Sequence, residues 1–218
     1  MVGSVNTTTM LHWVFLIIFA SKNKLTMAKL VYIDACVREN DSRTRRIAEP
    51  IIKALGERYE ISTFRLPEMN LEPLSPAAYA ERAVKIVPEW AAEAARTIAE
   101  ADRIVIAAPF WDMSFPSVLK VFFEQTSLFG ITFDSDDKAC YGLCKCKKVL
   151  YITTRGMDIP TGDPREQGTP YIKALSTLWN LGELETIAAT NMDYSTPEEI
   201  EAKVSGCIAE GLEIARDF

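Results

Sequence analysis

The chain of 218 residues is short of the side chains on which many enzymes and nucleic-acid-binding proteins depend. It has one histidine, His12, so a Ser-His-Asp triad or a histidine-rich zinc site would have to rely on that residue alone. Acidic residues outnumber basic ones by 30 to 24, and the net charge of −6 argues against a nucleic-acid partner. If the protein is an enzyme, its chemistry must come from carboxylates, thiols or a bound cofactor.

The chain also has little that would hold it in a membrane. The apolar run at residues 10–20, MLHWVFLIIFA, is shorter than the roughly 20 residues that span a bilayer, and no lysine or arginine precedes it as in a signal peptide. Residues 27–30, MAKL, are typical of the start of a cytosolic protein. We therefore expect residues 1–26 to be an extension that arises from the choice of start codon and lies outside the fold. A signal or membrane anchor and a structured N-terminal helix are the alternatives. Residues 27–218 are expected to form one domain of a cytoplasmic protein with no stable membrane insertion.

Short apolar strands alternate with amphipathic helices along the rest of the chain. Strands are predicted at residues 30–35, 60–66, 103–108, 148–153 and 186–191. Helices are predicted at residues 43–55, at 77–100 in two segments, and at 116–129, 170–181 (stopped by Gly182) and 196–217. Pro50 should kink the first helix or delay its start. The alternation predicts an α/β fold with a doubly wound, five-stranded parallel sheet in the flavodoxin-like order 2-1-3-4-5, covered by helices on both faces.

Ligands of such sheets bind in the loops beyond the carboxyl ends of the strands. The loop after the first strand contains Arg38, Ser42, Arg43 and Thr44 and opens a helix, where free backbone N–H groups favour an anion. Because this loop lacks glycine, a dinucleotide GxGxxG motif and a Walker loop are excluded. A cradle for one monophosphate and a simple helix cap with solvated arginines remain as interpretations.

Two further loops follow strands at the same edge. The loop at residues 109–116, PFWDMSFP, forms a stiff apolar shelf that suits a planar ring, or else packs in the core or against a second subunit. After the fourth strand, Gly156 would let the backbone approach a ligand closely, or would simply form a turn.

Three segments in this order resemble the FMN-dependent NADH–quinone oxidoreductase and azoreductase family of the flavodoxin-like superfamily. They are Ser42-Arg43-Thr44, APFWDMSFPSVLK at residues 108–120, and KKVLYITTRG at residues 147–156. The resemblance implies that Arg38, Ser42 and Thr44 hold the phosphate of FMN. It implies that the flavin ring lies along these residues: Pro109, Phe110, Trp111, Asp112, Met113, Thr154, Arg155 and Gly156.

The same resemblance implies an activity and an assembly. NADH or NADPH would reduce FMN, and a quinone or azo compound would then take the two electrons in a ping-pong order, with no catalytic side chain and in a homodimer. The alternatives are an NAD(P)H:flavin reductase and a flavodoxin-like electron carrier without a pyridine-nucleotide site. Two departures from the family pattern put the acceptor in doubt. Asp112 stands where an asparagine is common, and Met157-Asp158 where a second glycine is common. A carboxylate beside the flavin would disfavour the anionic reduced flavin and lower its potential.

The five cysteines are too few and too irregular for a disulfide framework. Cys140, Cys144 and Cys146 form a C-x3-C-x-C pattern that matches no usual zinc or iron–sulfur spacing, so no metal is predicted. Incidental cysteines are expected there, with a redox-active thiol as the alternative. Cys36 precedes a helix N-terminus that would lower its pKa, and it is predicted to be the most reactive thiol.

Overall fold

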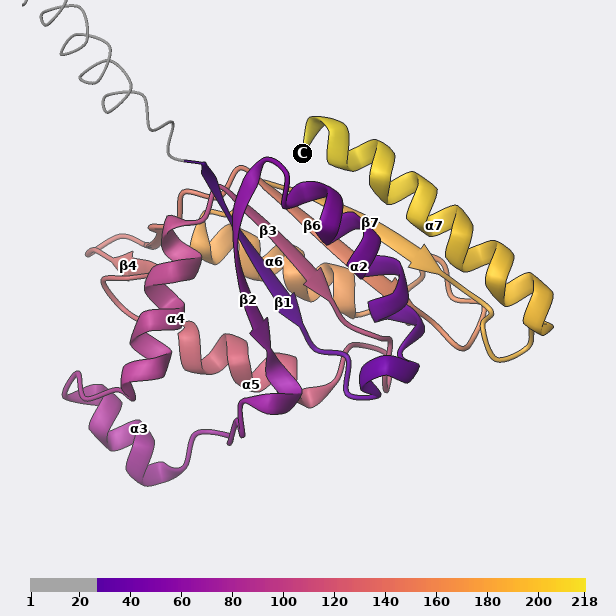
Figure 1. Ribbon diagram of the computed structural model, residues 1–218. Helices are drawn as coiled ribbons and strands as arrows, with labels where there is room; N and C mark the ends of the chain where they lie inside the picture. The colour runs from indigo at the N-terminus through magenta and orange to yellow at the C-terminus, as the bar shows by residue number, and fades with distance from the viewer. Residues whose placement is uncertain (1–26) are drawn as a thin grey trace, which may run out of the picture.

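The apolar segments of residues 27–218, the part of the chain that the computed structural model describes, form one parallel sheet (Figure 1). Its strands are β1 (Ala28–Asp34), β2 (Tyr59–Arg65), β3 (Arg103–Ala107), β6 (Lys148–Thr154) and β7 (Glu183–Ala189). They lie in the order β2-β1-β3-β6-β7 and all neighbours are parallel. Because β6 and β7 are the fourth and fifth strands of this sheet along the chain, the predicted order 2-1-3-4-5 is confirmed. The predictions for residues 1–26 lie outside the described residues.

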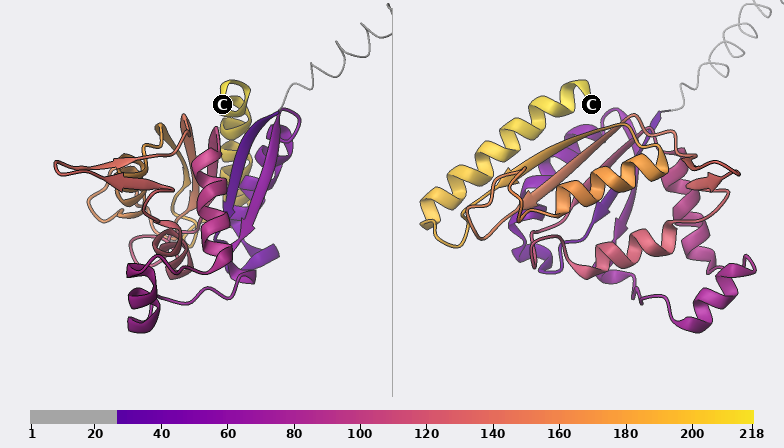
Figure 2. Two further views of the ribbon diagram at one scale, coloured as in Figure 1. Left: turned by 90° about the vertical axis from the view of Figure 1, so that its left-hand side faces the viewer. Right: turned by 180° about the vertical axis from the view of Figure 1, so that it is seen from behind.

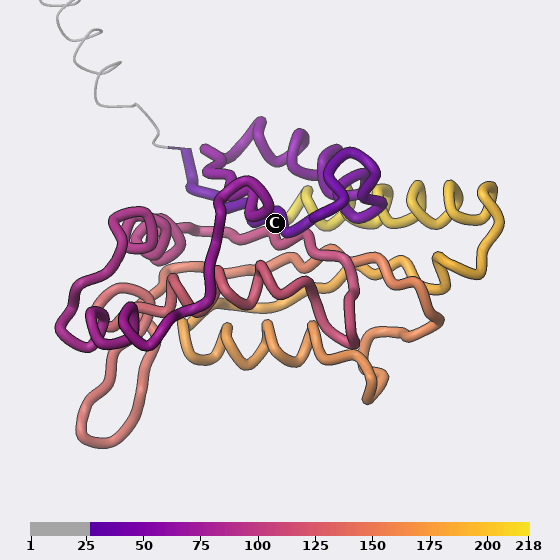
Figure 3. The backbone as a smooth tube through the Cα atoms, turned by 90° about the horizontal axis from the view of Figure 1, so that it is seen from below, coloured from indigo at the N-terminus to yellow at the C-terminus, as the bar shows by residue number. Residues whose placement is uncertain are grey.

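Helices cover both faces of the sheet, as Figure 3 shows in three layers. On one face lie α2 (Arg43–Leu55) and α7 (Pro197–Asp217), whose apolar side chains pack on β1, β3, β6 and β7. On the other lie α4 (Glu89–Glu100), α5 (Ser117–Thr126) and α6 (Gly168–Trp179). The central strands are therefore buried on both sides, which explains why they read as continuous apolar runs rather than alternating ones.

Two of the helix starts follow directly from local sequence. Ser42 caps α2 by accepting a hydrogen bond from the backbone N–H of Arg45. Thr196 and Glu199 form a reciprocal capping box at the start of α7. Helix α2 runs without interruption through Pro50, so the expected late start is wrong. Pro50 is the eighth residue of α2, so the helix lacks the backbone hydrogen bond that an N–H at this position would donate one turn back.

A short antiparallel hairpin of β4 (Phe133–Ser135) and β5 (Cys140–Gly142) was not expected from the sequence. It projects beside the main sheet (Figure 2, left). Each strand has only three residues, too few for a recognisable alternation of apolar and polar side chains. Gly142 is required where the hairpin meets α6, because a Cβ there would lie 2.0 Å from the carbonyl carbon of Trp179.

The remaining elements are α3 (Pro76–Ala83) and the short 3-10 helices η1 (Glu39–Asp41) and η2 (Leu66–Glu68). Most expected boundaries shift by one to three residues: for example, β7 begins at Glu183 rather than 186, α5 ends at Thr126 rather than 129, and α6 spans Gly168–Trp179 rather than 170–181. Asn180, with a φ of 60°, ends α6 in place of the expected Gly182. Within residues 27–218, no helix has the length and apolar character to cross a membrane.

Candidate cofactor-binding site

A cleft of about 200 Å³ lies at the carboxyl edge of the sheet, where the loops after β1, β3, β6 and β7 meet. Parallel strands end at a common edge, so segments far apart in the sequence converge there. The cleft is lined by Arg38, Ser42, Arg43, Pro109, Phe110, Trp111, Thr154, Gly156, Met192 and Asp193.

Seven of the eleven site residues predicted from the sequence line this cleft: Arg38, Ser42, Pro109, Phe110, Trp111, Thr154 and Gly156. The other four, Thr44, Asp112, Met113 and Arg155, do not line it. Met192 and Asp193, in the loop after β7, were not predicted. The signal that identifies them is topological: β7 ends at the same edge as the strands whose loops were considered.

One end of the cleft is cationic and rich in hydrogen-bond donors. It lies in the β1–α2 loop (residues 36–42) and the first turn of α2, where Ser42 is buried and Arg38 and Arg43 flank it. Arg43 donates through Nη1 to the carbonyl of Met192 at 3.2 Å and to Oδ1 of Asp193 at 3.3 Å. The helix N-terminus adds backbone N–H groups without partners in the helix, so this end suits an anion such as a phosphate.

Thr44 does not line the cleft but supports its cationic end from within the protein. Its hydroxyl is fully buried and lies 2.7 Å from the hydroxyl of Thr154, where either oxygen can be the donor. This hydrogen bond ties the start of α2 to the end of β6. Thr44 therefore fixes the distance between two walls of the cleft.

The aromatic wall is held by an unusual turn. The N–H groups of Trp111 and Ser114 each donate to the other's carbonyl, at 3.1 and 2.8 Å. Between them, Asp112 and Met113 have φ values of 47° and 66°, as in a type I′ turn, which favours glycine and asparagine. For other residues the left-handed region costs roughly 1–2 kcal/mol each. This strained turn leaves the side chain of Trp111 41% exposed at the mouth of the cleft.

Arg155 lies beneath the aromatic wall rather than in the cleft. Its side chain is fully buried, with the guanidinium carbon 5.7 Å from the ring centre of Phe110. It donates to the carbonyl of Ile159 at 2.8 Å and to the hydroxyl of Thr161 at 3.1 Å, and it lies 3.7 Å from Glu166. Burial lowers the pKa of the Arg155 guanidinium, and the charge of Glu166 opposes that shift. Arg155 thus supports Phe110 and the loop after β6 from inside the protein.

Gly156 lets the loops after β6 and β7 lie against each other. A Cβ at this position would lie 2.0 Å from Oδ2 of Asp193. The backbone N–H of Asp193 donates to the carbonyl of Gly156 at 3.0 Å, and that of Met192 to the carbonyl of Arg155, also at 3.0 Å. The two loops therefore form one continuous wall.

The sequence predicted that Cys36 would be a reactive thiol in the loop after β1, but the structure does not place it in the cleft. Cys36 is completely buried, and its Sγ lies 3.6 Å from the carbonyl oxygen of Ala107. Burial, together with the nearby charge of Asp34, raises the pKa of the Cys36 thiol to about 12. The prediction of a reactive Cys36 is wrong because the side chain is buried in the core, and burial raises the pKa of the thiol by more than the hydrogen bond with Ser42, at the start of α2, lowers it. Cys144 and Cys146 are also buried, whereas Cys140 is exposed.

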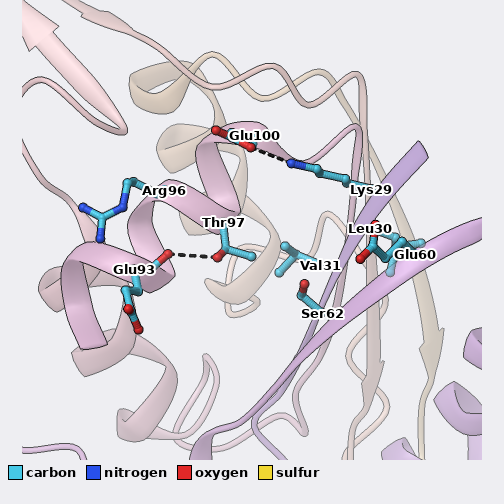
Figure 4. A pocket seen from close by; sticks show the side chains of 9 residues that line it. All are labelled: Lys29, Leu30, Val31, Glu60, Ser62, Glu93, Arg96, Thr97 and Glu100. Carbon is cyan, nitrogen blue, oxygen red and sulfur yellow. Dashed lines mark hydrogen bonds and ion pairs between the residues drawn. The ribbon is translucent and has the colours of Figure 1, made fainter. Parts of the chain in front are cut away.

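A larger groove, of about 520 Å³, lies near the amino ends of β1 and β2, beside α4 (Figure 4). In this groove Lys29 pairs with Glu100 at 2.6 Å, and Thr97 donates to the backbone carbonyl of Glu93 at 2.9 Å (Figure 4). It has neither an aromatic wall nor a helix N-terminus that faces it. We therefore place the functional site in the smaller cleft at the carboxyl edge.

Comparison with known proteins agrees with this architecture. The family described as flavodoxin-like fold matches residues 28–210. The chain is 31% identical to FMN-dependent NADH:quinone oxidoreductase 2 of Clostridium acetobutylicum over 206 residues, which cover 88% of this chain and 100% of that protein. It is 29% identical to FMN-dependent NADH:quinone oxidoreductase of Clostridium perfringens over 200 residues, with the same coverage. The chain thus belongs to the flavodoxin-like family and, within it, to the FMN-dependent NADH:quinone oxidoreductases.

Solved structures show the same fold. The FMN-dependent NADH-azoreductase from Bacillus anthracis, in complex with FMN, aligns with a TM-score of 0.75 at 19% identity, covering 88% of this chain and 99% of that one. Another azoreductase from Bacillus anthracis aligns with a TM-score of 0.73 at 17% identity.

Proposed function

We propose that this protein is an FMN-dependent oxidoreductase that carries two electrons from NADH to a quinone or an azo compound. One observation carries the proposal: a single cleft joins a cationic, hydroxyl-lined end at the start of α2 to an aromatic wall made by the loop after β3. A phosphate at one end and a flat, partly apolar ring at the other are the two parts of FMN. The names of the curated relatives support the same cofactor, donor and acceptor.

The residues present fit this cofactor. Ser42, with Arg38 and Arg43, would hold the phosphate, and Phe110 and Trp111 would lie along the ring. The backbone at Thr154 and Gly156 would meet the polar edge of the ring. Thr44, Asp112, Met113 and Arg155 would act through their neighbours, by fixing the walls described above.

When bound, FMN supplies the hydride chemistry, and the protein supplies position and electrostatics. The loops after β3 and β6 would orient the ring, and the exposed Trp111 would stand at the side that stays open. Because the cleft offers one aromatic wall, donor and acceptor would use the same open side in turn, which is a ping-pong order.

We also propose that the protein is a homodimer whose second copy completes this site. The cleft of about 200 Å³ is smaller than the roughly 300–1,000 Å³ of most ligand pockets, so its walls are incomplete in one chain. Exposed apolar side chains surround it: Val37, Trp111, Met113 and Met157 are between 37% and 41% exposed. Apolar surface of this kind around a site is typical of an interface. The five unpaired cysteines are in keeping with a reducing compartment, and we propose a cytoplasmic location.

The absorption spectrum of the purified protein, recorded before and after anaerobic addition of NADH, tests the function. The expected result is a flavin spectrum, native or restored by added FMN, that bleaches with NADH and returns when a quinone is added. A protein that binds no FMN contradicts the proposal. Bound FMN that NADH cannot reduce indicates an electron carrier instead, and FMN that leaves the protein at each turnover indicates a flavin reductase.

Ser42→Ala tests the placement of the phosphate, with Ser75→Ala as its matched control. Both serines cap a helix, Ser42 at α2 and Ser75 at α3, so each variant should lose about 1 kcal/mol of stability. Only Ser42→Ala should weaken FMN binding, by about tenfold or more, since a hydrogen bond to a charged group is worth about 1.5–3 kcal/mol. Equal FMN dissociation constants for the two variants, measured by fluorescence titration, would show that the phosphate binds elsewhere.

A further inference from the structure

A buried ion pair lies directly behind the cationic end of the cleft. Asp34, the last residue of β1, is fully buried, and its Oδ1 accepts a hydrogen bond from the backbone N–H of Cys36 at 3.0 Å. Its Oδ2 lies 2.8 Å from Nε of Arg45, a residue in the first turn of α2 whose side chain is 7% exposed. Arg65, on β2, is a more exposed second partner at 3.3 Å. Neither Asp34 nor Arg45 lines the cleft.

Arg45 joins both ends of the β1–α2 loop. Its Nη2 donates to the carbonyl of Cys36 at 3.4 Å, at the beginning of the loop. Its backbone N–H donates to Oγ of Ser42 at 3.3 Å, at the end of the loop. With the bond from the Cys36 N–H to Asp34, these contacts determine where the loop leaves β1 and where it enters α2. The guanidinium of Arg45 acts at the β1 end, where it contacts both Asp34 and the carbonyl of Cys36.

Arg45 also balances a charge that would otherwise oppose an anion. A buried carboxylate behind a phosphate site repels the phosphate strongly unless a cation compensates for it, because interactions are weakly screened in the interior. Arg45 is the buried cation at Asp34, so Arg38 and Arg43, which line the cleft, do not have to compensate for that carboxylate. Arg43 instead contacts Met192 and Asp193 at the opposite loop.

We propose that Arg45 is a positioning residue for the phosphate group of FMN: paired with Asp34, it presets the β1–α2 loop and neutralises the charge behind it. This inference rests on the proposed function, because it assigns a role within the same site. It predicts that changing Arg45 weakens only the binding of the phosphate group. Riboflavin has the same ring but no phosphate, so its affinity should stay unchanged while that of FMN falls.

The test measures dissociation constants of FMN and riboflavin by fluorescence titration for wild type, Arg45→Met and Arg45→Lys. Arg45→Met keeps much of the apolar stem but loses the charge and the hydrogen bonds. It should lower the preference for FMN over riboflavin about tenfold or more, since each 1.4 kcal/mol corresponds to tenfold. Arg45→Lys keeps the charge but not the planar fork that reaches both Asp34 and Cys36, so it should lie between wild type and Arg45→Met. If Arg45→Lys prefers FMN over riboflavin as strongly as wild type does, the positioning role is overturned and only the effect of the charge remains.

Glu166→Gln is the matched control. It disrupts the other buried arginine–carboxylate pair, Arg155–Glu166, near the aromatic wall rather than the phosphate end. It should lower stability yet leave the preference for FMN over riboflavin within about twofold of wild type. An equal loss of preference in Glu166→Gln would mean that any damage to the interior weakens phosphate binding, which contradicts a specific role of Arg45.

Amide hydrogen exchange of the wild-type protein keeps the inference testable if Arg45→Met fails to fold. A preset loop requires the amides of Cys36 and Ser42 to be protected before FMN is added, through their bonds to Asp34 Oδ1 and to the carbonyl of Glu39. Fast exchange that slows only when FMN binds would show that the ligand, not Arg45, orders the loop. A wild-type protein that binds neither flavin contradicts the proposed function itself. FMN binding with unchanged preference in both Arg45 variants contradicts only this inference.

Discussion

Individual thiols of this chain differ in reactivity for reasons that their spacing does not reveal. Cys140, Cys144 and Cys146 occur within seven residues, yet the first is exposed on the β4–β5 hairpin and the other two are buried. Burial raises the pKa of Cys144 to about 12 and that of Cys146 to about 11. Because the thiolate is the reacting form and must be accessible, the two buried thiols are protected, and Cys140 is the exposed one of the three.

We therefore expect iodoacetamide to label Cys140 alone in the native protein at about pH 8, as read by mass spectrometry of peptides. Cys36 should remain unlabelled even at higher pH, since its folded pKa of about 12 lies above the usual 9.0. Because the pKa of the Cys36 thiol is higher in the folded protein than in the unfolded chain, the neutral thiol favours folding fully below pH 9. This contribution to stability is lost as the pH rises toward 12. Labelling of all five cysteines in denaturant is the control, and native labelling of Cys36 at the rate of Cys140 would contradict the burial.

At the scale of elements, Gly182 illustrates how one residue serves packing rather than helix termination. Helix α6 already ends at Asn180, and a Cβ at Gly182 would lie 1.8 Å from the carbonyl oxygen of Lys147 and 2.2 Å from its carbonyl carbon. Both are backbone atoms, which cannot turn away as a side chain can. The close approach lets β7 pair with β6 from its first residue, Glu183.

Gly182→Ala should accordingly destabilise the protein by about 3 kcal/mol through overpacking. Gly206→Ala, in the interior of α7, is the matched control, because a Cβ there meets nothing within 4 Å. It should stabilise the protein by about 0.5–1 kcal/mol, the helix-propensity difference between the two residues. Urea unfolding curves measure both changes, and a stability loss of similar size in the two variants would refute this account of Gly182.

At the scale of the whole molecule, the exposed apolar residues around the cleft predict a dimer. Sedimentation should give twice the chain mass of 24.4 kDa. Met157→Glu places a charge at this rim and should shift the protein toward monomer, whereas Leu212→Glu, on α7 and equally exposed at 38%, should not. A monomeric wild type, or equal behaviour of the two variants, would contradict the proposed interface.

Much of the fold was predictable because its signals are local. The buried strands appear as apolar runs, and Ser42 and Thr196 mark helix starts through bonds to residues three positions away. The β4–β5 hairpin was missed because its strands are too short for a periodic pattern. At the site, Ser42, Phe110 and Gly156 were predicted from three loops, but Asp193 was not, since its role depends on contact with a loop about 40 residues earlier in the chain.

The sequence by itself determined the order of strands and helices and the cationic and aromatic segments of the cleft, because hydrophobic periodicity and residue chemistry are local properties. Only the tertiary structure decided where each side chain points. Cys36 and Arg155 both face inward, and Arg45 meets Asp34 behind the cleft rather than the ligand. The physical reason is that burial and charge pairing depend on which strands and loops become neighbours. Because β1, β3, β6 and β7 end at one edge, Arg38 and Arg43 line the cleft, whereas Arg45, in the same segment, lies behind it.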